Sequence, residues 1–385
     1  MFPYIQILPI PTDAQPNALM VASLYLILYS DSRVNKFVFI LLSLVIISFL
    51  IGFSYAGRID FPSFRSLFNY LSLLIITCVG ILYFKNNSRF SFVLFKIAFF
   101  ANFTVSLIQK LFDKHALIFF VHRTQTTLSR GVTGLTPEAT FNATIALLLL
   151  ILYLIHFRRH NSKLYFSLFA VWILLLAQSA TIVFVFSAAL FIFLIVKKFR
   201  YALAAIIVAM LVTAAINWYT YHGSQNTRIA QVFSTLIRNP EVFLTFDRSI
   251  NDRVSHVIAP IFITANNFFR PLGPDYDYFN KQSYELRFKY VPFLFITQNG
   301  IPKWSAILSG WGMLFFECGI MGIVFFVVFN ILAIKNLFVS DSHFFAFLLF
   351  SLLIFTAVSL NTALIPFLFG NFFYLIIYHK KGSKK

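Results

Sequence analysis

Two polar stretches of the chain carry arginines interleaved with acidic and aromatic side chains. They span residues 110–138 and 218–305. The arginines in them that could do chemistry are Arg123, Arg130, Arg248, Arg253 and Arg270. A guanidinium group stays charged and binds two phosphate oxygens at once, so this set suits a pyrophosphate or an acidic sugar and requires no metal ion. The same charges would equally keep a loop in water, so their position and neighbours must decide between the two.

Three side chains beside these arginines are candidates for moving a proton. Glu138 follows Pro137, and this pair makes a good helix start whether or not Glu138 takes part in catalysis. Asp252 is a second candidate base. If its segment is helical, Arg253 and His256 lie on adjacent turns of one face. His256 is a candidate proton carrier, although a single histidine is more often an ordinary polar residue.

Two further residues are candidates for holding a substrate. Tyr276 belongs to a group of aromatic side chains whose mixture with charges suits a sugar site and equally a membrane interface. Glu317 falls in an apolar stretch, where a carboxylate is costly unless it has a function or pairs with an arginine. The spelling Asp275-Tyr276-Asp277 resembles a metal-binding motif of sugar-nucleotide enzymes. Those donors are cytoplasmic, whereas the charges discussed below orient this stretch outward, so we expect neither a metal nor a cofactor.

The elements that position these residues are membrane helices. With 59% hydrophobic and 11% charged residues, the 385-residue chain cannot cover its apolar surface in a soluble fold. Stretches near the roughly 20 apolar residues that cross a bilayer core recur from end to end. We expect an all-α polytopic integral membrane protein with about eleven transmembrane helices. Their expected spans are 17–30, 37–54, 67–84, 91–109, 139–157, 164–178, 180–196, 201–217, 306–334, 343–359 and 361–378.

The basic residues in the short connections encode orientation. By the positive-inside rule, connections rich in lysine and arginine are cytoplasmic. The residues that define them are Arg33, Lys36, Lys85, Arg89, Arg158, Arg159, Lys163, Lys197, Lys198, Arg200, Lys335 and the tail lysines. Every second connection then faces outward, including 55–66, 110–138 and 218–305. The formal net charge of +18 therefore reports topology, and we expect no nucleic-acid partner.

The spans divide the chain into three parts. Residues 1–217 hold eight expected transmembrane helices with the outer loop 110–138, residues 218–305 form a large outer loop, and residues 306–385 hold three helices and a basic tail. Residues 1–16 contain no lysine or arginine, so we expect the first helix, rather than a cleavable signal peptide, to direct insertion. Cys78 and Cys318 both fall in expected helices, which favours packing roles over a disulfide or a thiolate cluster.

Short sequence motifs in two regions of the first half of the chain match known patterns. Residues 130–143 read RGVTGLTPEATFNA. They are similar to the outer-loop pattern of the polymerases in the O-antigen polymerase and O-antigen ligase group of membrane glycosyltransferases. They depart from it in that Pro137 precedes the acid and Thr140 stands where serine is usual. Residues 178–181, QSAT, resemble the Ser-x-Thr turn of the family, although such hydroxyls also serve helix ends.

Two further sequence motifs, in the second half of the chain, also resemble this group. Residues 247–253, DRSINDR, followed by residues 270–274, RPLGP, are similar to a Ser-x-Asn-x-Arg stretch, a spacer and Pro-small-Gly. Residues 309–322, which contain SGWG and FECGIMG, resemble the closing helix with its acid-x-Gly-x-x-Gly signature. Ligases usually place a His-Asn pair where this chain has Leu308-Ser309, so the resemblance favours a polymerase.

The resemblance implies a GT-C-like enzyme of the bacterial inner membrane whose active site and large, partly helical loop face the periplasm. Its substrates would be undecaprenyl-pyrophosphate-linked glycans, with the lipid bilayer and a chain-length regulator protein as further partners. In family terms Arg253 contacts the pyrophosphate. The other substrate-binding candidates are Arg123, Arg130, Arg248, Arg270, Tyr276 and Glu317, and the catalytic candidates are Glu138, Asp252, Arg253 and His256.

A ligase and a transporter of lipid-linked sugars remain the alternatives. The missing His-Asn pair weighs against the ligase. A transporter often has charged residues near mid-membrane or broken helices in paired repeats. Here only Lys96, Asn102 and Asn142 interrupt the expected helices, and no inverted repeat is visible in the sequence, so both features weigh against a transporter.

Overall fold

The computed structural model describes most of the chain. Its described residues are 3–6, 16–29, 34–57, 60–87, 90–121, 131–158, 160–199, 235, 239, 242, 248–296, 300–356, 358–360 and 362–382. Within these ranges the protein is built of helices, and the β pairing is an isolated bridge between Ile5 and Val121. The all-α fold class expected from the sequence is thus confirmed for the described residues.

The helices follow one another closely along the chain. In order they are α1 (Asn17–Leu28), α2 (Lys36–Ala56), α3 (Phe61–Asn87), α4 (Phe92–Leu111), the short η1 (Ile118–Phe120), α5 (Ala139–His156), α6 (Ser162–Ala170), the π-helix η2 (Val171–Ala177), α7 (Ala180–Lys197), α11 (Arg248–Asn266), α12 (Tyr276–Lys289), α13 (Gly310–Cys318), α14 (Ile320–Leu337), α15 (Asp341–Thr356) and α16 (Leu364–Gly382). Helix η2 continues α6 without a gap.

Six helices are long and apolar enough to cross a membrane, namely α2, α3, α4, α5, α7 and α14. The shorter apolar helices are α1, the continuous α6–η2 segment, α15 and α16. Nine of the ten coincide with an expected span, and α14 covers only the second part of the expected span 306–334. The expected span 201–217 lies outside the described residues. The described part of the chain is therefore that of an α-helical membrane protein.

Polar side chains mark where several of these apolar helices begin. Asn35 caps α2 by accepting a hydrogen bond from the Phe37 amide at 2.9 Å. Ser309 likewise caps α13 by accepting one from the Gly312 amide at 3.0 Å. These caps satisfy amides that the first helical turn leaves without a backbone partner, so they fix where each helix starts.

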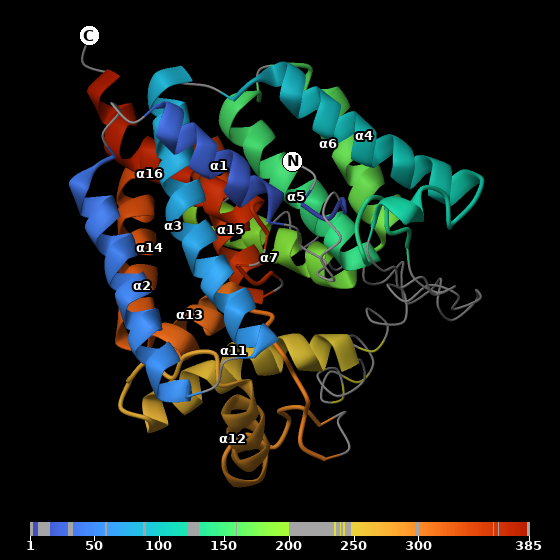
Figure 1. The fold of residues 1–385 in the computed structure, drawn as a ribbon. Helices are drawn as coiled ribbons and strands as arrows, with labels where there is room; N and C mark the ends of the chain where they lie inside the picture. The colour runs from blue at the N-terminus through green and yellow to red at the C-terminus, as the bar shows by residue number, and fades with distance from the viewer. Residues whose placement is uncertain are drawn as a thin grey trace.

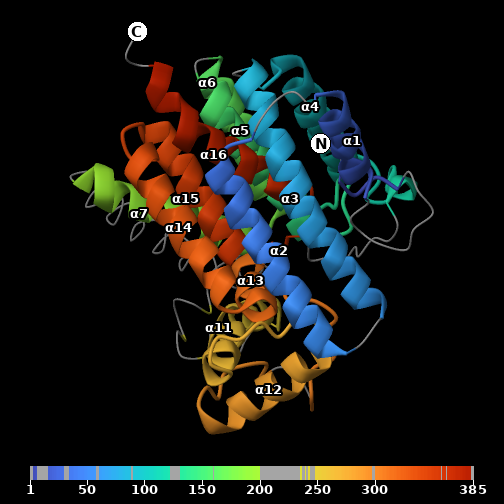
Figure 2. The same cartoon turned by 60° about the vertical axis from the view of Figure 1, so that its left-hand side comes forward.

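A cap covers one end of the helix bundle. Helices α2, α3, α14, α15 and α16 run along the bundle, and α5 is the most buried of the six candidate spans (Figure 1). Helix α11 lies across the end at which α2 ends and α3 begins, with α12 beyond it (Figure 2). We call residues 248–296 the cap. It packs on the bundle mainly through α11 against α13.

Helix ends that are predicted to lie on the same side of the membrane contact one another in the structure. The His156 ring at the end of α5 stacks on Phe84 at the end of α3, with ring centroids 4.9 Å apart. At the end of α7, Lys197 and Lys198 lie 3.7 and 3.6 Å from the Asp341 carboxylate at the start of α15. Each contact joins two connections that the positive-inside rule assigns to the same side.

The expectation of one continuous helix over 306–334 is wrong. The chain breaks at Gly319, which has φ +54°, into α13 and α14. The cause is the turn after α11, because the Phe269 carbonyl accepts a hydrogen bond from the Ile320 amide at 2.8 Å. A Cβ atom on Gly319 would lie 2.4 Å from that carbonyl oxygen, so a residue with a side chain does not fit there.

Candidate functional site

The arginine-rich word 247–253 lies largely on the first turns of α11. The Arg248 guanidinium, on the exposed side, lies 3.7 Å from the buried Asp252 carboxylate one turn later. Arg253 is half-buried on the following position. The segment is helical, which is the condition on which the sequence argument about Arg253 and His256 depended. Two arginines, with an acid between them in the chain, lie at the start of α11. Such a group can bind an anion and hold a proton acceptor near it.

His256 lies one turn beyond Arg253 inside an aromatic box. Its ring stacks on Phe279 and meets Trp304 and Phe295 edge-on, with centroids 5.8, 4.7 and 5.5 Å away. Burial, reinforced by the positive charge of Arg253, lowers the pKa of His256 from 6.5 to about 3. The imidazole is therefore neutral near pH 7 and a weak proton acceptor.

The ring of His256 is fully buried. Neither of its nitrogens has a hydrogen-bond partner among the described residues. In this arrangement the imidazole has no exposed surface through which a substrate could contact it. Its visible role is to pack α11 against α12 and the loop that carries Trp304.

The segments 270–274 and 316–322 lie side by side and are joined by backbone hydrogen bonds. The amides of Leu272 and Gly273 donate hydrogen bonds to the carbonyls of Phe316 and Glu317 at 3.1 and 3.2 Å. Gly273 has φ +65°, and a Cβ atom on it would lie 2.4 Å from the backbone of Gly52 in α2. The Pro-small-Gly word is therefore the point at which the cap touches α2 and α13.

Arg270 stands exposed at the start of this word. Its guanidinium Nη2 donates to the Asn267 side-chain oxygen at 3.2 Å. The Tyr278 hydroxyl donates to the same oxygen at 3.0 Å. Arg270 is thus held at the edge of the cap with its charge toward solvent.

Tyr276 and Glu317 contact each other rather than open space. The Tyr276 hydroxyl donates a hydrogen bond to Glu317 Oε1 at 2.6 Å, and Ser66 Oγ of α3 lies 2.7 Å from that hydroxyl. Glu317 is fully buried and Tyr276 is 6% exposed. Burial, followed by the charge of Glu317, raises the pKa of Tyr276 well above its usual range. These three residues fasten the start of α12 to α3 and α13.

Two residues at this junction, Arg65 and Ser66 of α3, were not among the candidates predicted from the sequence. The Arg65 guanidinium hydrogen-bonds to the Ser305 carbonyl and exerts an electrostatic effect on both Glu317 and Tyr276. An arginine and a serine in an outward connection were the available signal. Their partners come from three other segments of the chain, which no local pattern connects.

The Asp275-Tyr276-Asp277 motif has a structural role. The Asp275 carboxylate caps α12 by accepting a hydrogen bond from the Tyr278 amide at 3.0 Å, and Asp277 is exposed in the first turn. The motif therefore forms the N-terminus of α12. Among the described residues, no group of three or more His, Cys, Asp or Glu side chains is arranged to hold a metal ion.

Glu138 lies at the start of α5 on a loop fixed by buried polar side chains. It is the N-cap residue, one position before the expected first turn, and its side chain makes no capping bond. Asn142 holds the loop by donating to the Val132 carbonyl at 3.0 Å while its oxygen accepts from Trp172 Nε1 at 3.0 Å. Asn142 is thus a satisfied structural residue. Arg123 and Arg130 lie outside the described residues.

The loop before α5 connects to the cap through the start of α7. The Val132 amide donates to the Leu176 carbonyl at 2.9 Å, just before the turn that opens α7. On the next turn, Ala180 packs on Ile250 of α11. The structure thus joins the segments 270–274 and 309–322 where the cap meets the bundle. The segment 247–253 lies at the other end of α11, near residues 178–181 and the loop of Glu138.

Comparisons of the chain with protein-family models, with curated proteins and with solved structures find no match. The fold and the site define the class as an α-helical membrane protein with a basic, aromatic cap over one end of its bundle.

Proposed function

We propose that this protein is a polymerase of lipid-linked oligosaccharides that resembles the O-antigen polymerase family. In this proposal the chain crosses the bacterial inner membrane about eleven times in a GT-C-like arrangement, and the cap faces the periplasm. The observation that carries the proposal is the backbone pairing of two distant segments, in which the amides of Leu272 and Gly273 donate to the carbonyls of Phe316 and Glu317. Helix α11, whose first turns hold most of 247–253, packs on α13 beside this pairing.

The proposed reaction transfers a growing glycan from undecaprenyl pyrophosphate to a lipid-linked repeat unit. An acceptor hydroxyl attacks the anomeric carbon of the donor sugar, and the bond from that carbon to the pyrophosphate oxygen breaks. The leaving pyrophosphate keeps the electron pair, and its charge is stabilised by guanidinium groups such as Arg253 and Arg248. The hydroxyl proton passes to a carboxylate, for which Asp252 and Glu138 are the candidates.

The remaining candidates divide by exposure. Arg270 is exposed at the cap edge, which suits a substrate contact, and Arg123 and Arg130 stay candidates from the sequence alone. His256, Tyr276 and Glu317 are buried against protein groups. In the proposal these three hold the cap in position and leave substrate contact to the arginines.

One observation favours a transporter of lipid-linked sugars as the second candidate. The break between α13 and α14 at Gly319 directly follows the buried carboxyl group of Glu317. Broken helices beside buried acids are typical of transporters. The experiment must therefore separate synthesis of a polymer from movement of a lipid.

The test is O-antigen display on a gel in a deletion strain of the native host. We expect the deletion to leave lipid A core with a single repeat unit, and wild type to restore the ladder. Arg253→Ala should lower polymer yield by about 10²-fold at equal expression, because a charged group that stabilises the leaving group is lost. Lys289→Ala, which removes an exposed positive charge from the last turn of α12, is the matched control and should restore the ladder.

Other outcomes point elsewhere. If the deletion abolishes even the single-repeat band while lipid-linked polymer accumulates, the protein is a ligase. If the deletion removes the ladder and the single repeat together and lipid-linked repeat units accumulate in the inner leaflet, it is a transporter. A ladder unchanged by deletion would contradict all three.

A further inference from the structure

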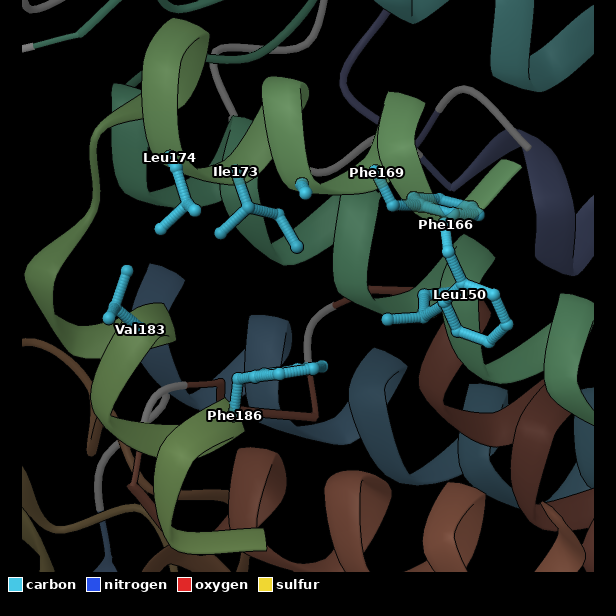
Figure 3. Close-up of a pocket in the computed structure, with 8 residues that line it drawn as sticks. Leu150, Phe166, Phe169, Ile173, Leu174, Val183 and Phe186 are labelled. Atoms are coloured by element: carbon cyan, nitrogen blue, oxygen red, sulfur yellow. The ribbon is translucent and has the colours of Figure 1, made fainter. Parts of the chain in front are cut away.

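An apolar pocket lies between α5, the α6–η2 segment and α7. Figure 3 shows Phe166, Phe169, Ile173 and Leu174 facing Val183 and Phe186 of α7 across a gap, with Leu150 of α5 at one side. Its volume is about 110 Å³. All the side chains that line it are hydrocarbon, so water gains nothing by entering.

The π-helix η2 shapes one wall of the pocket. The Gln178 amide donates to the Ile173 carbonyl five residues earlier, at 3.1 Å, which is the wider π pattern. Leu174, on this segment, is 49% exposed, so the wall reaches the outer surface of the described bundle. A hydrocarbon chain in the bilayer can therefore approach it from the side.

The end of the pocket that Val183 lines lies near the first turns of α11. Val183 lines the pocket, and the next residue, Phe184, packs with Val254 and Ile250 of α11. Arg253 immediately precedes Val254 in the chain. An anionic headgroup bound by Arg248 and Arg253 would thus lie within about one or two helical turns of the place where its hydrocarbon chain enters the pocket.

The size of the pocket selects the kind of chain. An apolar cavity of about 150 Å³ holds one benzene molecule, so a slightly smaller one suits a branched group of about five carbons. We propose that this pocket binds an isoprene unit of the polyprenyl chain whose pyrophosphate is bound by Arg248 and Arg253. This inference rests on the proposed function for the identity of the lipid.

The test is photolabelling of the full-length protein in lipid nanodiscs with farnesyl pyrophosphate that carries a diazirine on its chain. Labelled peptides are mapped by mass spectrometry. We expect label within residues 166–186. Val183→Trp fills the pocket and should lower this labelling by about tenfold, because the buried surface for the chain is lost. Ile195→Trp places the same side chain on the exposed face of α7 and should leave labelling unchanged.

A second variant and a second probe test whether the labelling depends on the pocket and on the branched shape of the chain. Ala170→Phe fills the pocket from the opposite wall, and only variants that elute as the wild type does are compared. A straight-chain decyl pyrophosphate with the same diazirine should label these residues less. Label elsewhere, equal label in Val183→Trp and Ile195→Trp, or equal label by the straight chain would overturn the inference.

The inference and the proposed function can fail separately. Label in the pocket from a protein that forms no polymer would leave the isoprenoid site standing and remove the polymerase. Polymer formation that is unaffected by either pocket variant, with no label in the pocket, would do the reverse.

Discussion

At the scale of single residues, burial separates side chains that can meet a substrate from those that cannot. Arg248, Arg253 and Arg270 keep at least part of their surface exposed, whereas His256 and Glu317 are fully enclosed. A charge at the surface binds an anion without prior desolvation of the site, whereas a buried neutral imidazole binds its neighbours. The arginines are therefore the residues on which the proposed chemistry depends.

The buried imidazole of His256 makes stability depend on pH in a defined direction. Its pKa is lowered from 6.5 to about 3 in the folded protein, so between these values the unfolded chain binds a proton that the folded chain does not. Its contribution is present above pH 6.5 and is lost as pH falls, by about 1.4 kcal/mol per pH unit. We expect His256→Phe to flatten the decline in unfolding free energy between pH 6.5 and 4.

That decline is measured by denaturant unfolding in detergent at several pH values. Phenylalanine suits the aromatic box in size and polarity, so the variant should fold at pH 7. A slope identical to that of the wild type would show that His256 takes up its proton in the folded state.

At the scale of elements, the cap is positioned by backbone contacts as much as by side chains. The segment 270–274 donates two amides to carbonyls near the end of α13, and it fits only because Gly273 faces Gly52. The Tyr276–Glu317 hydrogen bond then fixes the start of α12. Loosening either contact would move Arg270 and the end of α11 relative to the bundle.

Gly273→Ala tests this docking. A side chain at φ +65° costs about 1 kcal/mol, and the clash of the new Cβ with the Gly52 backbone adds to that cost. We expect a fall in Tm of several degrees, seen by thermal unfolding in detergent. Gly300→Ala is the control, because Gly300 has φ +97° but nothing within 4 Å of an added Cβ. Equal falls in the two variants would mean that the docking contact contributes nothing.

At the scale of the whole molecule, local sequence patterns predict what depends on composition. Apolar stretches of membrane-spanning length gave the helices over 36–56, 61–87 and 139–156, because lipid demands both apolar side chains and internal backbone hydrogen bonds. The relation of Arg253 to His256 followed from their spacing once the segment was taken as helical, and α11 places them on adjacent turns. These features follow from residues close together in the chain.

The features that could not be predicted depend on residues far apart. At the break, the Ile320 amide donates a hydrogen bond to the Phe269 carbonyl. The apolar run 306–334 contains Gly319, but the run alone does not show that the chain turns there to meet Phe269. Glu317 finds its partner Tyr276 41 residues away, with Ser66 from yet another helix. A glutamate in an apolar stretch indicates that its carboxylate needs a polar partner. Only the packing of α3, α12 and α13 shows that the partners are side chains of the protein itself.

In the proposed function, the protein joins lipid-linked repeat units into a polymer. The most direct measurement uses the purified full-length protein in lipid nanodiscs, supplied only with a repeat unit on polyprenyl pyrophosphate, and follows the products by mass spectrometry. We expect oligomers of two and more repeats, with one free polyprenyl pyrophosphate released for each glycosidic bond formed. Unchanged single repeats in the presence of folded, substrate-bound wild-type protein would contradict it.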